Sequence, residues 1–306
     1  GGLSCVGDNR FGQLGDGTVD VDDPVAEPVT VVGLADVVDI AAGRTHTCAS
    51  LVDGTVRCWG DNQRGQLGDG TTDDRSTPVP VPGLSGIVQV TAGQDHACAL
   101  TQGGEVTCWG RNNSGQLGDG TTDDRSSPVG AVTGAVWVDA GAEHTCAVLG
   151  DGTVSCWGSN SSGRLGDGTS DNRPTPGPVV EIDSAVQVST GWRHTCATLA
   201  DRTVRCWGRN DDGEAGRPFV PADAPTPIQL PGVDDAIGIG LGQSFTCVVH
   251  EGGGLSCVGD NRFGQLGDGT AIERGVVTPV VGIDDVIAVA GGVNFTCALR
   301  EPPSSP

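Results

Sequence analysis

The sequence contains no lysine, no tyrosine and no methionine, and aromatic residues make up only 4% of its 306 positions. A surface for nucleic acid or anionic lipid needs clustered basic residues, but this chain carries 17 arginines against 39 acidic residues and a net charge of −22. We therefore expect no nucleic-acid partner and no docking on an anionic membrane. With so few aromatic side chains, a packed core must depend on Val, Leu, Ile and Ala.

Long apolar runs are missing too. No segment approaches the ~20 apolar residues that a membrane helix needs, and no signal peptide is visible, so we expect no membrane insertion. The missing initiator methionine indicates a processed or excised segment. Sustained helical periodicity is also absent, which leaves short strands and turns as the elements of the fold.

Cysteine, by contrast, is plentiful and regularly spaced. Ten of the twelve cysteines form five couples, each ten positions apart, and Cys5 and Cys297 are left over. The couples lack the close spacing of structural zinc sites, so an even set of this kind favours disulfides. Several disulfides in turn indicate an oxidising, extracytoplasmic compartment, at the cell surface or secreted.

The couples belong to a repeat. From Cys48 the first cysteines follow at intervals of 50, 48, 50, 51 and 50 positions, and one copy begins "VVDIAAGRTHTCASLVDGTVRCWGDNQRGQLGDGT". Alternating apolar pairs such as Val38 and Ile40 predict the first strand of each copy. The glycine-containing triplet at 52–54 predicts a hairpin that places Cys48 opposite Cys58, within reach of a disulfide. The proline-rich segment 76–83 suits an outer edge strand.

The two ends of the chain are complementary halves of one repeat. Residues 1–18 recur without change at 253–270, where they follow "SFTCVVHE" and complete a hairpin. The chain therefore starts with the second half of a unit, and it stops after "NFTCALRE", the first half of another. Joining the ends completes a sixth unit, which favours a closed ring over a linear stack.

We thus predict an all-β fold, a six-bladed β-propeller of four-stranded antiparallel blades. N- and C-terminal strands share one blade and close the ring, and each blade holds one disulfide. A single domain covers residues 1–300, and residues 301–306 are predicted to be a Pro/Ser linker or tail. The predicted disulfides are Cys48–Cys58, Cys98–Cys108, Cys146–Cys156, Cys196–Cys206, Cys247–Cys257 and Cys5–Cys297.

The phrases "AGRTHTCAS" and "DGTVRCWGDNQRGQLGDGT" resemble the regulator-of-chromosome-condensation repeat family, and the resemblance covers nearly all of residues 1–300. It implies a β-propeller of four-stranded blades, usually seven where we count six. The eukaryotic namesake is a nuclear nucleotide exchange factor for a small GTPase. This acidic, cystine-rich chain is more similar to the secreted bacterial branch, whose members include protein-binding and enzyme-inhibiting propellers.

Several repeated positions carry residue types that also occur in metal or binding sites. For each of them we favour a structural role. A ring of histidines two residues before the first cysteine of a blade suggests a metal site, but phenylalanine replaces histidine in two blades. We interpret them as core residues whose polar edge bonds to the backbone, and the "CWG" tryptophans as blade packing. The histidine positions are His46, His96, His144 and His194, with Phe245 and Phe295, and the tryptophans are Trp59, Trp109, Trp157 and Trp207.

The acidic "GDGTTDD" stretches leave calcium open as an alternative to ordinary Asp-Gly turns, because calcium prefers several oxygen ligands. The residues concerned are Asp69, Asp73, Asp74, Asp119, Asp123 and Asp124. Otherwise we expect no cofactor and no metal. No nucleophile elbow, phosphate-binding loop or free nucleophilic cysteine emerges, so we predict that the protein is not an enzyme.

Positions that vary between copies are the better candidates for binding. They form two sets, the turn before each His or Phe and the loop after each "WG". Arginine and aromatic residues are enriched at binding hot spots, which favours several of them. The candidates are Arg44, Asp95, Glu143, Trp192, Arg193, Arg10, Phe11, Arg262 and Phe263.

We predict that the protein is a monomeric, non-catalytic extracytoplasmic propeller whose function is to bind a protein partner. In one form of this hypothesis the propeller inhibits an enzyme. A glycan-binding propeller, a regulator of a small GTPase and a structural module of a larger surface protein are the alternatives.

Ring closure can be tested by non-reducing peptide mapping. If the terminal strands share a blade, Cys5 and Cys297 are recovered in one disulfide-linked peptide that separates on reduction. Recovery of the two cysteines in separate peptides contradicts the closure, and the five predicted hairpin bridges serve as internal controls.

Overall fold

The computed structural model describes residues 2–217 and 223–301, so residues 302–306 of the tail predicted at 301–306 lie outside the described residues. Within these segments the regular elements are strands, apart from one 3-10 turn, η1 (Ser161–Gly163). Among the described residues, no helix has the length and apolar character that a membrane crossing requires. The all-β prediction is confirmed.

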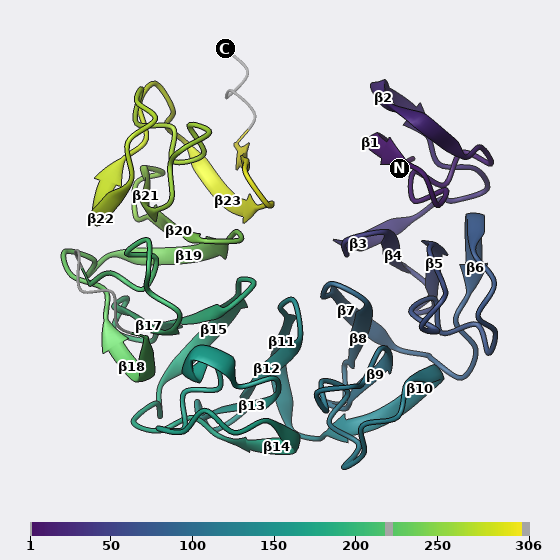
Figure 1. Ribbon diagram of the computed structural model, residues 1–306, viewed down its shortest axis with the longest axis horizontal. Helices are drawn as coiled ribbons and strands as arrows, with labels where there is room; N and C mark the ends of the chain where they lie inside the picture. The colour runs from purple at the N-terminus through teal and green to yellow at the C-terminus, as the bar shows by residue number, and fades with distance from the viewer. Residues whose placement is uncertain (1, 218–222, 302–306) are drawn as a thin grey trace. The chain divides into compact units, whose positions relative to one another are not determined.

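The strands form repeated antiparallel sheets of four (Figure 1). The first consists of β3 (Val37–Ala42), β4 (His46–Leu51), β5 (Val56–Gly60) and β6 (Arg75–Pro80). The second consists of β7 (Ile87–Ala92), β8 (His96–Thr101), β9 (Val106–Gly110) and β10 (Arg125–Val132). The third consists of β11 (Ala135–Ala140), β12 (His144–Leu149), β13 (Val154–Gly158) and β14 (Arg173–Pro178).

Two more sheets of the same order follow along the chain. One consists of β15 (Ala185–Thr190), β16 (His194–Leu199), β17 (Val204–Gly208) and β18 (Ala224–Gln229). The other consists of β19 (Ala236–Leu241), β20 (Phe245–His250), β21 (Leu255–Gly259) and β22 (Arg274–Pro279). A two-stranded sheet stands at each end of the chain, β1 (Ser4–Asn9) with β2 (Asp20–Thr30), and β23 (Val286–Gly291) with β24 (Thr296–Arg300).

The chain forms two compact units, which are described separately. Unit 1 comprises Gly1–Ala147, Trp157–Ser159 and Asn172–Gly177. Unit 2 comprises Val148–Cys156, Asn160–Asp171 and Pro178–Pro306. The sheet β11-β12-β13-β14 contributes some of its residues to unit 1 and the others to unit 2.

The hairpin predicted around each cysteine couple is confirmed. In β4 and β5, Ser50 pairs with Val56 and Cys48 with Cys58, and the disulfide joins Cα atoms 4.1 Å apart. Disulfides of the same kind join Cys98 to Cys108, Cys196 to Cys206 and Cys247 to Cys257. Cys146 and Cys156 are disulfide-bonded as well. The proline-rich strand β6 lies at the sheet edge, where prolines remove no ladder hydrogen bond.

The first strand departs from simple alternation in five of the sheets. The register shifts between Ile87 and Gln89 of β7, and at the equivalent place in β3, β15, β19 and β23. Such a bulge inserts one residue and moves the following side chains to the other face. Val88 is therefore exposed while Val90 is buried, although both belong to one predicted alternating pair.

The two terminal sheets are complementary halves of the repeat, as predicted. β1 pairs with β2 as β21 pairs with β22, with Cys5 opposite Val29 and Cys257 opposite Thr278. β23 pairs with β24 as β19 pairs with β20. Cys5 and Cys297 are free cysteines and belong to different units, so their bridge and the closure of six blades stay predictions.

Successive sheets within a unit are joined by buried tryptophans. The Trp59 indole donates a hydrogen bond to the Gln13 carbonyl oxygen at 2.9 Å, and the Thr47 hydroxyl donates to the same oxygen at 3.0 Å. Gly68 lies so close to the Trp109 ring that a Cβ would fall within 2.8 Å of it. The four "CWG" tryptophans are fully buried, which confirms their packing role.

Two of the buried histidines bond to a side chain of the next sheet. Nε2 of His96 lies 3.0 Å from the Thr145 hydroxyl, and Nε2 of His194 lies 3.0 Å from the Thr246 hydroxyl. His46 has no such hydroxyl partner, because Ala97 stands where the threonine would be. Phe245 fills the equivalent position in full burial, so this is a core site that accepts either ring.

The buried His46 generates a prediction about acid stability. Burial lowers the pKa of His46 to about 4 from 6.5, although the nearby Asp95 and Asp61 charges oppose the shift. Because the folded protein holds the ring neutral, stability is lost as the pH falls below 6.5, by about 1.4 kcal/mol per pH unit. His46→Phe should change the free energy of unfolding little at neutral pH and raise it, relative to wild type, as the solution becomes acidic.

Urea unfolding across that pH range measures the effect. His96→Phe is the matched control, since it loses the hydrogen bond to Thr145 and should cost about 1 kcal/mol at neutral pH. A constant difference between His46→Phe and wild type at every pH contradicts the prediction.

Candidate functional site

The two variable sets predicted from the repeat emerge at the same edge of each sheet. Antiparallel strands alternate in direction, so the turn between the first two strands and the loop between the last two share an edge. Backbone bonds hold the two together: the Asp61 amide donates to the Thr45 carbonyl at 2.9 Å, and the Arg209 amide donates to the Arg193 carbonyl at 2.8 Å. We call this edge, with its turns and loops, the loop edge.

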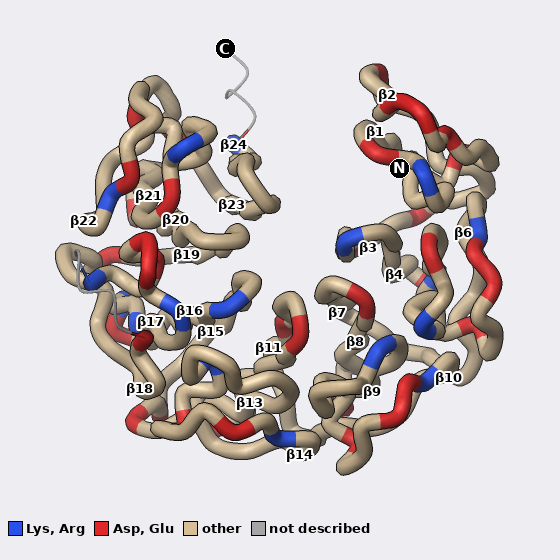
Figure 2. The backbone as a smooth tube through the Cα atoms, viewed as in Figure 1, with Lys and Arg blue, Asp and Glu red and all other residues tan. Residues whose placement is uncertain are grey.

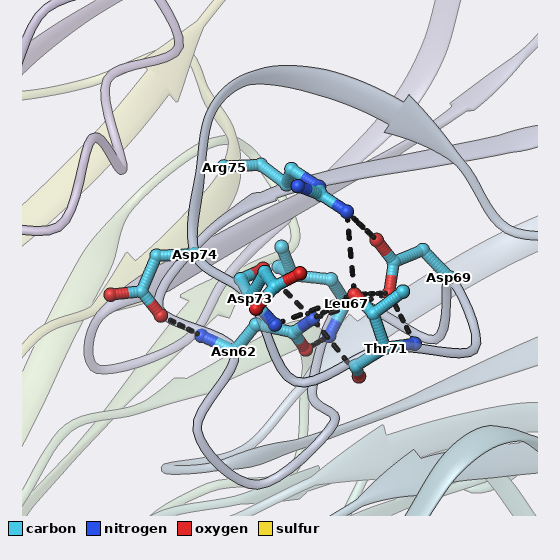
Figure 3. A network of polar contacts seen from close by, with 7 residues as sticks. All are labelled: Asn62, Leu67, Asp69, Thr71, Asp73, Asp74 and Arg75. Carbon is cyan, nitrogen blue, oxygen red and sulfur yellow. Dashed lines mark hydrogen bonds and ion pairs between the residues drawn. The ribbon is translucent and has the colours of Figure 1, made fainter.

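A buried asparagine fixes the conformation of each long loop (Figure 3). The Asn62 side-chain amide donates to Asp69, to the Thr71 carbonyl and hydroxyl, and to the Asp73 carbonyl. Its Oδ1 accepts the Leu67 amide at 2.9 Å. Asn112 and Asn261 make corresponding bonds in their loops. The loop backbone is thus held from within.

The aspartates of the loop are used in the same network. Asp69 Oδ1 accepts from the Thr71 amide and hydroxyl, and its Oδ2 faces Arg75 at 3.2 Å (Figure 3). Asp74 accepts the Asn62 amide at 2.8 Å. This bonding gives two aspartates of the "GDGTTDD" pattern a role within the loop itself. Among the described residues, no group of three or more His, Cys, Asp or Glu is arranged to hold a metal ion.

In unit 1 the structure brings Asp95 and Glu143 together around an arginine that the sequence analysis missed. Nη1 of Arg111 lies 3.1 Å from Asp95 Oδ2 and 3.6 Å from Glu143 Oε1. The turns that carry these residues are joined by backbone, since the Arg44 amide donates to the Gln94 carbonyl and the Gln94 amide to the Ala142 carbonyl. Arg44 itself is exposed.

The other candidates of unit 1, Arg10 and Phe11, lie in the loop after β1. The exposed Arg10 guanidinium forms a two-point pair with Asp8, 2.7 Å at the closest, and the same guanidinium lowers the pKa of Asp8. Phe11 is half-buried, and its amide donates to the Gln13 side chain at 2.9 Å. The identical segment in unit 2 differs in exposure.

In unit 2, Phe263 is 70% exposed, and the neighbouring Arg262 pairs with Asp260 at 2.9 Å. Trp192 is half-buried in its turn, where its carbonyl accepts a hydrogen bond from Arg164 at 3.0 Å, and Arg193 is exposed. The loop edge of unit 2 therefore presents two aromatic side chains, each next to an arginine.

A second missed arginine, Arg209, organises a charged cluster at the loop edge of unit 2. It lies 2.7 Å from Asp211, 3.3 Å from Asp212 and 3.8 Å from Glu214, and donates to the Ser244 hydroxyl at 3.0 Å. Arg209 and Arg111 both follow directly on a "WG" pair, where other copies have Asp or Ser. Comparing the copies at that position would have found both.

Figure 2 shows acidic segments in the loops of both units, with arginine segments interspersed among them. The contacts explain this pattern, since Arg64 pairs with Asp124, Arg125 with Asp119, and Arg274 with Asp268. A carboxylate neighbour offsets the positive charge of each of these arginines.

Comparison with known proteins identifies a family and a fold. The profile of the RCC1-like domain matches residues 1–298. The crystal structure of human WBSCR16 superposes with a TM-score of 0.88 at 24% identity, covering 98% of this chain and 82% of that one. Prp20p of Saccharomyces cerevisiae, described with its binding properties to Gsp1p and histones, gives 0.83 at 24% identity, covering 97% and 78%. At such identities the likeness establishes the fold.

A closer sequence match is short. The human E3 ubiquitin-protein ligase HERC2 is 43% identical over 74 residues, which is 24% of this chain and 2% of that protein. The chain thus spans about 2% of the length of the curated relatives that it matches.

The buried Glu214 generates a prediction about pH. Burial raises the pKa of Glu214 from 4.5 to about 7, with Asp212 adding to the shift and Arg209 opposing it. The protonated acid is therefore favoured in the folded state, and its contribution to stability is lost as the pH rises from 4.5 to about 7. Glu214→Gln, which restores the residue found at positions 66, 116 and 265, should remove up to about 3 kcal/mol of this pH dependence.

Urea unfolding of the wild type and of Glu214→Gln between pH 4.5 and about 7 measures this difference in pH dependence. Asp211→Asn, which removes an exposed carboxylate from the same arginine, is the control and should leave the pH dependence in place. Identical pH profiles for Glu214→Gln and wild type contradict the assignment.

Proposed function

The chain belongs to the RCC1-like domain family, and on this premise we propose that it is a non-catalytic β-propeller scaffold that binds a protein partner through its loop edge. Family members share a fold but not one function, so the proposal depends on the chain's own residues. These divide into a repeated frame and a variable surface.

The frame supports binding because it is held rigid from within. The Asn261 side chain bonds Asp268 and the Thr270 and Ile272 carbonyls, and it accepts the Leu266 amide. A disulfide closes the hairpin beside the loop, joining Cys247 to Cys257. A surface that is already ordered loses little conformational entropy on binding, which favours affinity.

One observation carries the proposal: Phe263 stands 70% exposed on this rigid loop, next to Arg262. A large exposed aromatic side chain beside an arginine is typical of a binding hot spot. Trp192 and Arg193 repeat the combination in the turn between β15 and β16 of the same unit. We assign the leading role to these four residues, and a supporting role to Arg44, Asp95 and Glu143 in unit 1.

The disulfides support an extracytoplasmic location for this activity, because such bridges persist in oxidising compartments. A secreted, rigid, acidic scaffold suits an inhibitor that covers the site of an enzyme. We propose that role as the specific form of partner binding, with the protein acting as a monomer.

Regulation of a small GTPase is the second candidate, since Prp20p binds Gsp1p and shares the fold. The disulfides argue against it, because such GTPases work in reducing compartments. A release assay with labelled nucleotide separates the two candidates. Glycan binding has less support, because the tryptophans at equivalent positions are buried in the core.

Affinity capture from the native secretome tests the proposal. Wild-type protein should retain a partner that a Phe263→Ala, Arg193→Ala double variant retains at least about tenfold less well, as expected when hot-spot residues are lost. The control is Val52→Ser, at an exposed hairpin tip on the opposite edge of its sheet, which should retain the partner fully. Equal retention by both variants, or retention of glycans alone, rejects the loop edge as the protein-binding surface.

A further inference from the structure

Unit 2 contains a cavity of about 290 Å³ at the hairpin end of the sheet β19-β20-β21-β22, opposite its loop edge. Two polar side chains, those of His250 and Ser256, line it. The described residues of its wall include none of the four assigned above to partner binding, and only Gly216 comes from a loop of the loop edge. The rest of the wall is mainly apolar and includes Pro231, Val276, Val277 and Pro279.

A chain of hydrogen bonds runs from the cavity wall to a carboxylate. Nε2 of His250 lies 2.5 Å from the Ser256 hydroxyl, and Nδ1 of the same ring lies 2.6 Å from Asp235 Oδ1. A carboxylate only accepts hydrogen bonds, so in the neutral ring Nδ1 carries the hydrogen and Nε2 accepts from the serine. Serine, histidine and aspartate joined in this order form the arrangement in which a histidine activates a serine as a nucleophile.

The backbone holds these three residues in place. The Asp235 carbonyl accepts the Glu251 amide at 2.8 Å, and the His250 amide donates to the Gly254 carbonyl at 2.8 Å. Ser256 lies in β21 and is paired on both sides, with β20 and with β22. Its partner in β20 is two residues before His250, so the two side chains share one face of the sheet. Nucleophile and base are therefore held at a fixed separation, which favours reaction between positioned groups.

The histidine is a departure from the repeat. Ser155 occupies the position of Ser256 in β13, but there leucine stands in place of the histidine. That copy thus has the serine without the base. The residues at the histidine position in the other four-stranded sheets are Leu51, Thr101, Leu149 and Leu199.

We propose that Ser256 is a nucleophile that takes up a short apolar acyl group from an activated ester. Its oxygen attacks the carbonyl carbon while His250 Nε2 takes the hydroxyl proton. The bond from the carbonyl carbon to the leaving alcohol then breaks, and His250 returns the proton to that alcohol. Asp235 is a positioning residue, which holds the ring in the tautomer that accepts the proton.

The cavity determines which esters react. Ser256 is only 4% exposed and lines the cavity, so a reagent must enter the cavity to meet it. The apolar wall favours an uncharged hydrocarbon chain, which gains free energy by leaving water. A single transfer leaves the acyl group on Ser256 and requires no turnover. The site therefore adds a covalent modification to the scaffold and goes beyond the partner binding proposed above.

Release of p-nitrophenolate from p-nitrophenyl butyrate measures the transfer, after subtraction of hydrolysis in buffer. The wild type should release it at least about a hundredfold faster than Ser256→Ala or His250→Leu, because a positioned base contributes about 10²–10⁴-fold. His250→Leu introduces the residue found at positions 51, 149 and 199, so the fold should be retained, which circular dichroism checks. Ser155→Ala is the matched control and should react at the wild-type rate.

Phenylmethanesulfonyl fluoride identifies the atom that attacks, because its adduct with serine is stable. The serine oxygen bonds to sulfur, fluoride leaves, and His250 takes the proton. Peptide mapping should find the adduct on Ser256 and not on Ser4, which lies in the identical segment at residues 1–18. The two peptides are distinguished by the residues before Gly253. The chain has no lysine and no tyrosine, so few other side chains compete for the reagent.

The role of Asp235 has its own readout. Asp235→Asn should slow p-nitrophenolate release at least about tenfold, and ¹⁵N NMR of the His250 ring should show loss of the Nδ1–H tautomer. Release that is unchanged in His250→Leu, or equal labelling of Ser4 and Ser256, overturns the proposal. Neither measurement involves a partner, so failure here leaves the test of the loop edge unaffected.

Discussion

A single carbonyl oxygen per loop holds successive sheets together. Those of Gln13, Gln116 and Arg164 each accept a threonine hydroxyl and a tryptophan indole from the next sheet. Both lone pairs of a buried carbonyl are thereby satisfied, which avoids the cost of an unpaired polar group. Since the contact uses the main chain, it constrains the loop backbone but not the side chain attached to it.

That separation leaves the side chain free to change. The position carries Gln116, Arg164 and Glu214 in different sheets, and each carbonyl still accepts a threonine. The side chains serve other ends: Arg164 bonds the Trp192 carbonyl, and Glu214 accepts the Asp212 amide while facing Arg209. A fold held through backbone atoms can thus vary the chemistry of its loop edge without weakening the contact between sheets.

Structural features that recur in every copy of the repeat are predicted from the sequence. Contacts that depend on a residue of a neighbouring sheet are not. Cysteine spacing and the glycine at the hairpin tip determine the register of β4 with β5, because a two-sided pattern admits one alignment. The bulge in β7 escapes prediction, since residue types alone do not reveal an extra residue in a strand. The histidine partner escapes it too, because Thr145 lies 49 residues from His96 and in another sheet.

The candidate site shows the same division. Variable positions were found by comparing copies, and the structure places both sets at one edge of each sheet. Arg111 and Arg209 were missed because they stand at a position that carries aspartate or serine elsewhere and were taken with the frame. Their role depends on what faces them: Asp95 and Glu143 around the first, three carboxylates around the second. Charge pairing of this kind is set by tertiary packing, which a single sequence does not reveal.

One substitution at the contact between sheets is accompanied by a second across the interface, which helps to preserve the packing there. Where Val258 replaces tryptophan, Leu230 replaces the facing valine, so part of the lost volume is restored. Cores tolerate exchanges that conserve total volume far better than cavities. The identity of one residue in a pocket therefore carries information about its partner across the interface. Val179 accompanies Trp207 beside Gly166, and Val31 accompanies Trp59 beside Gly15.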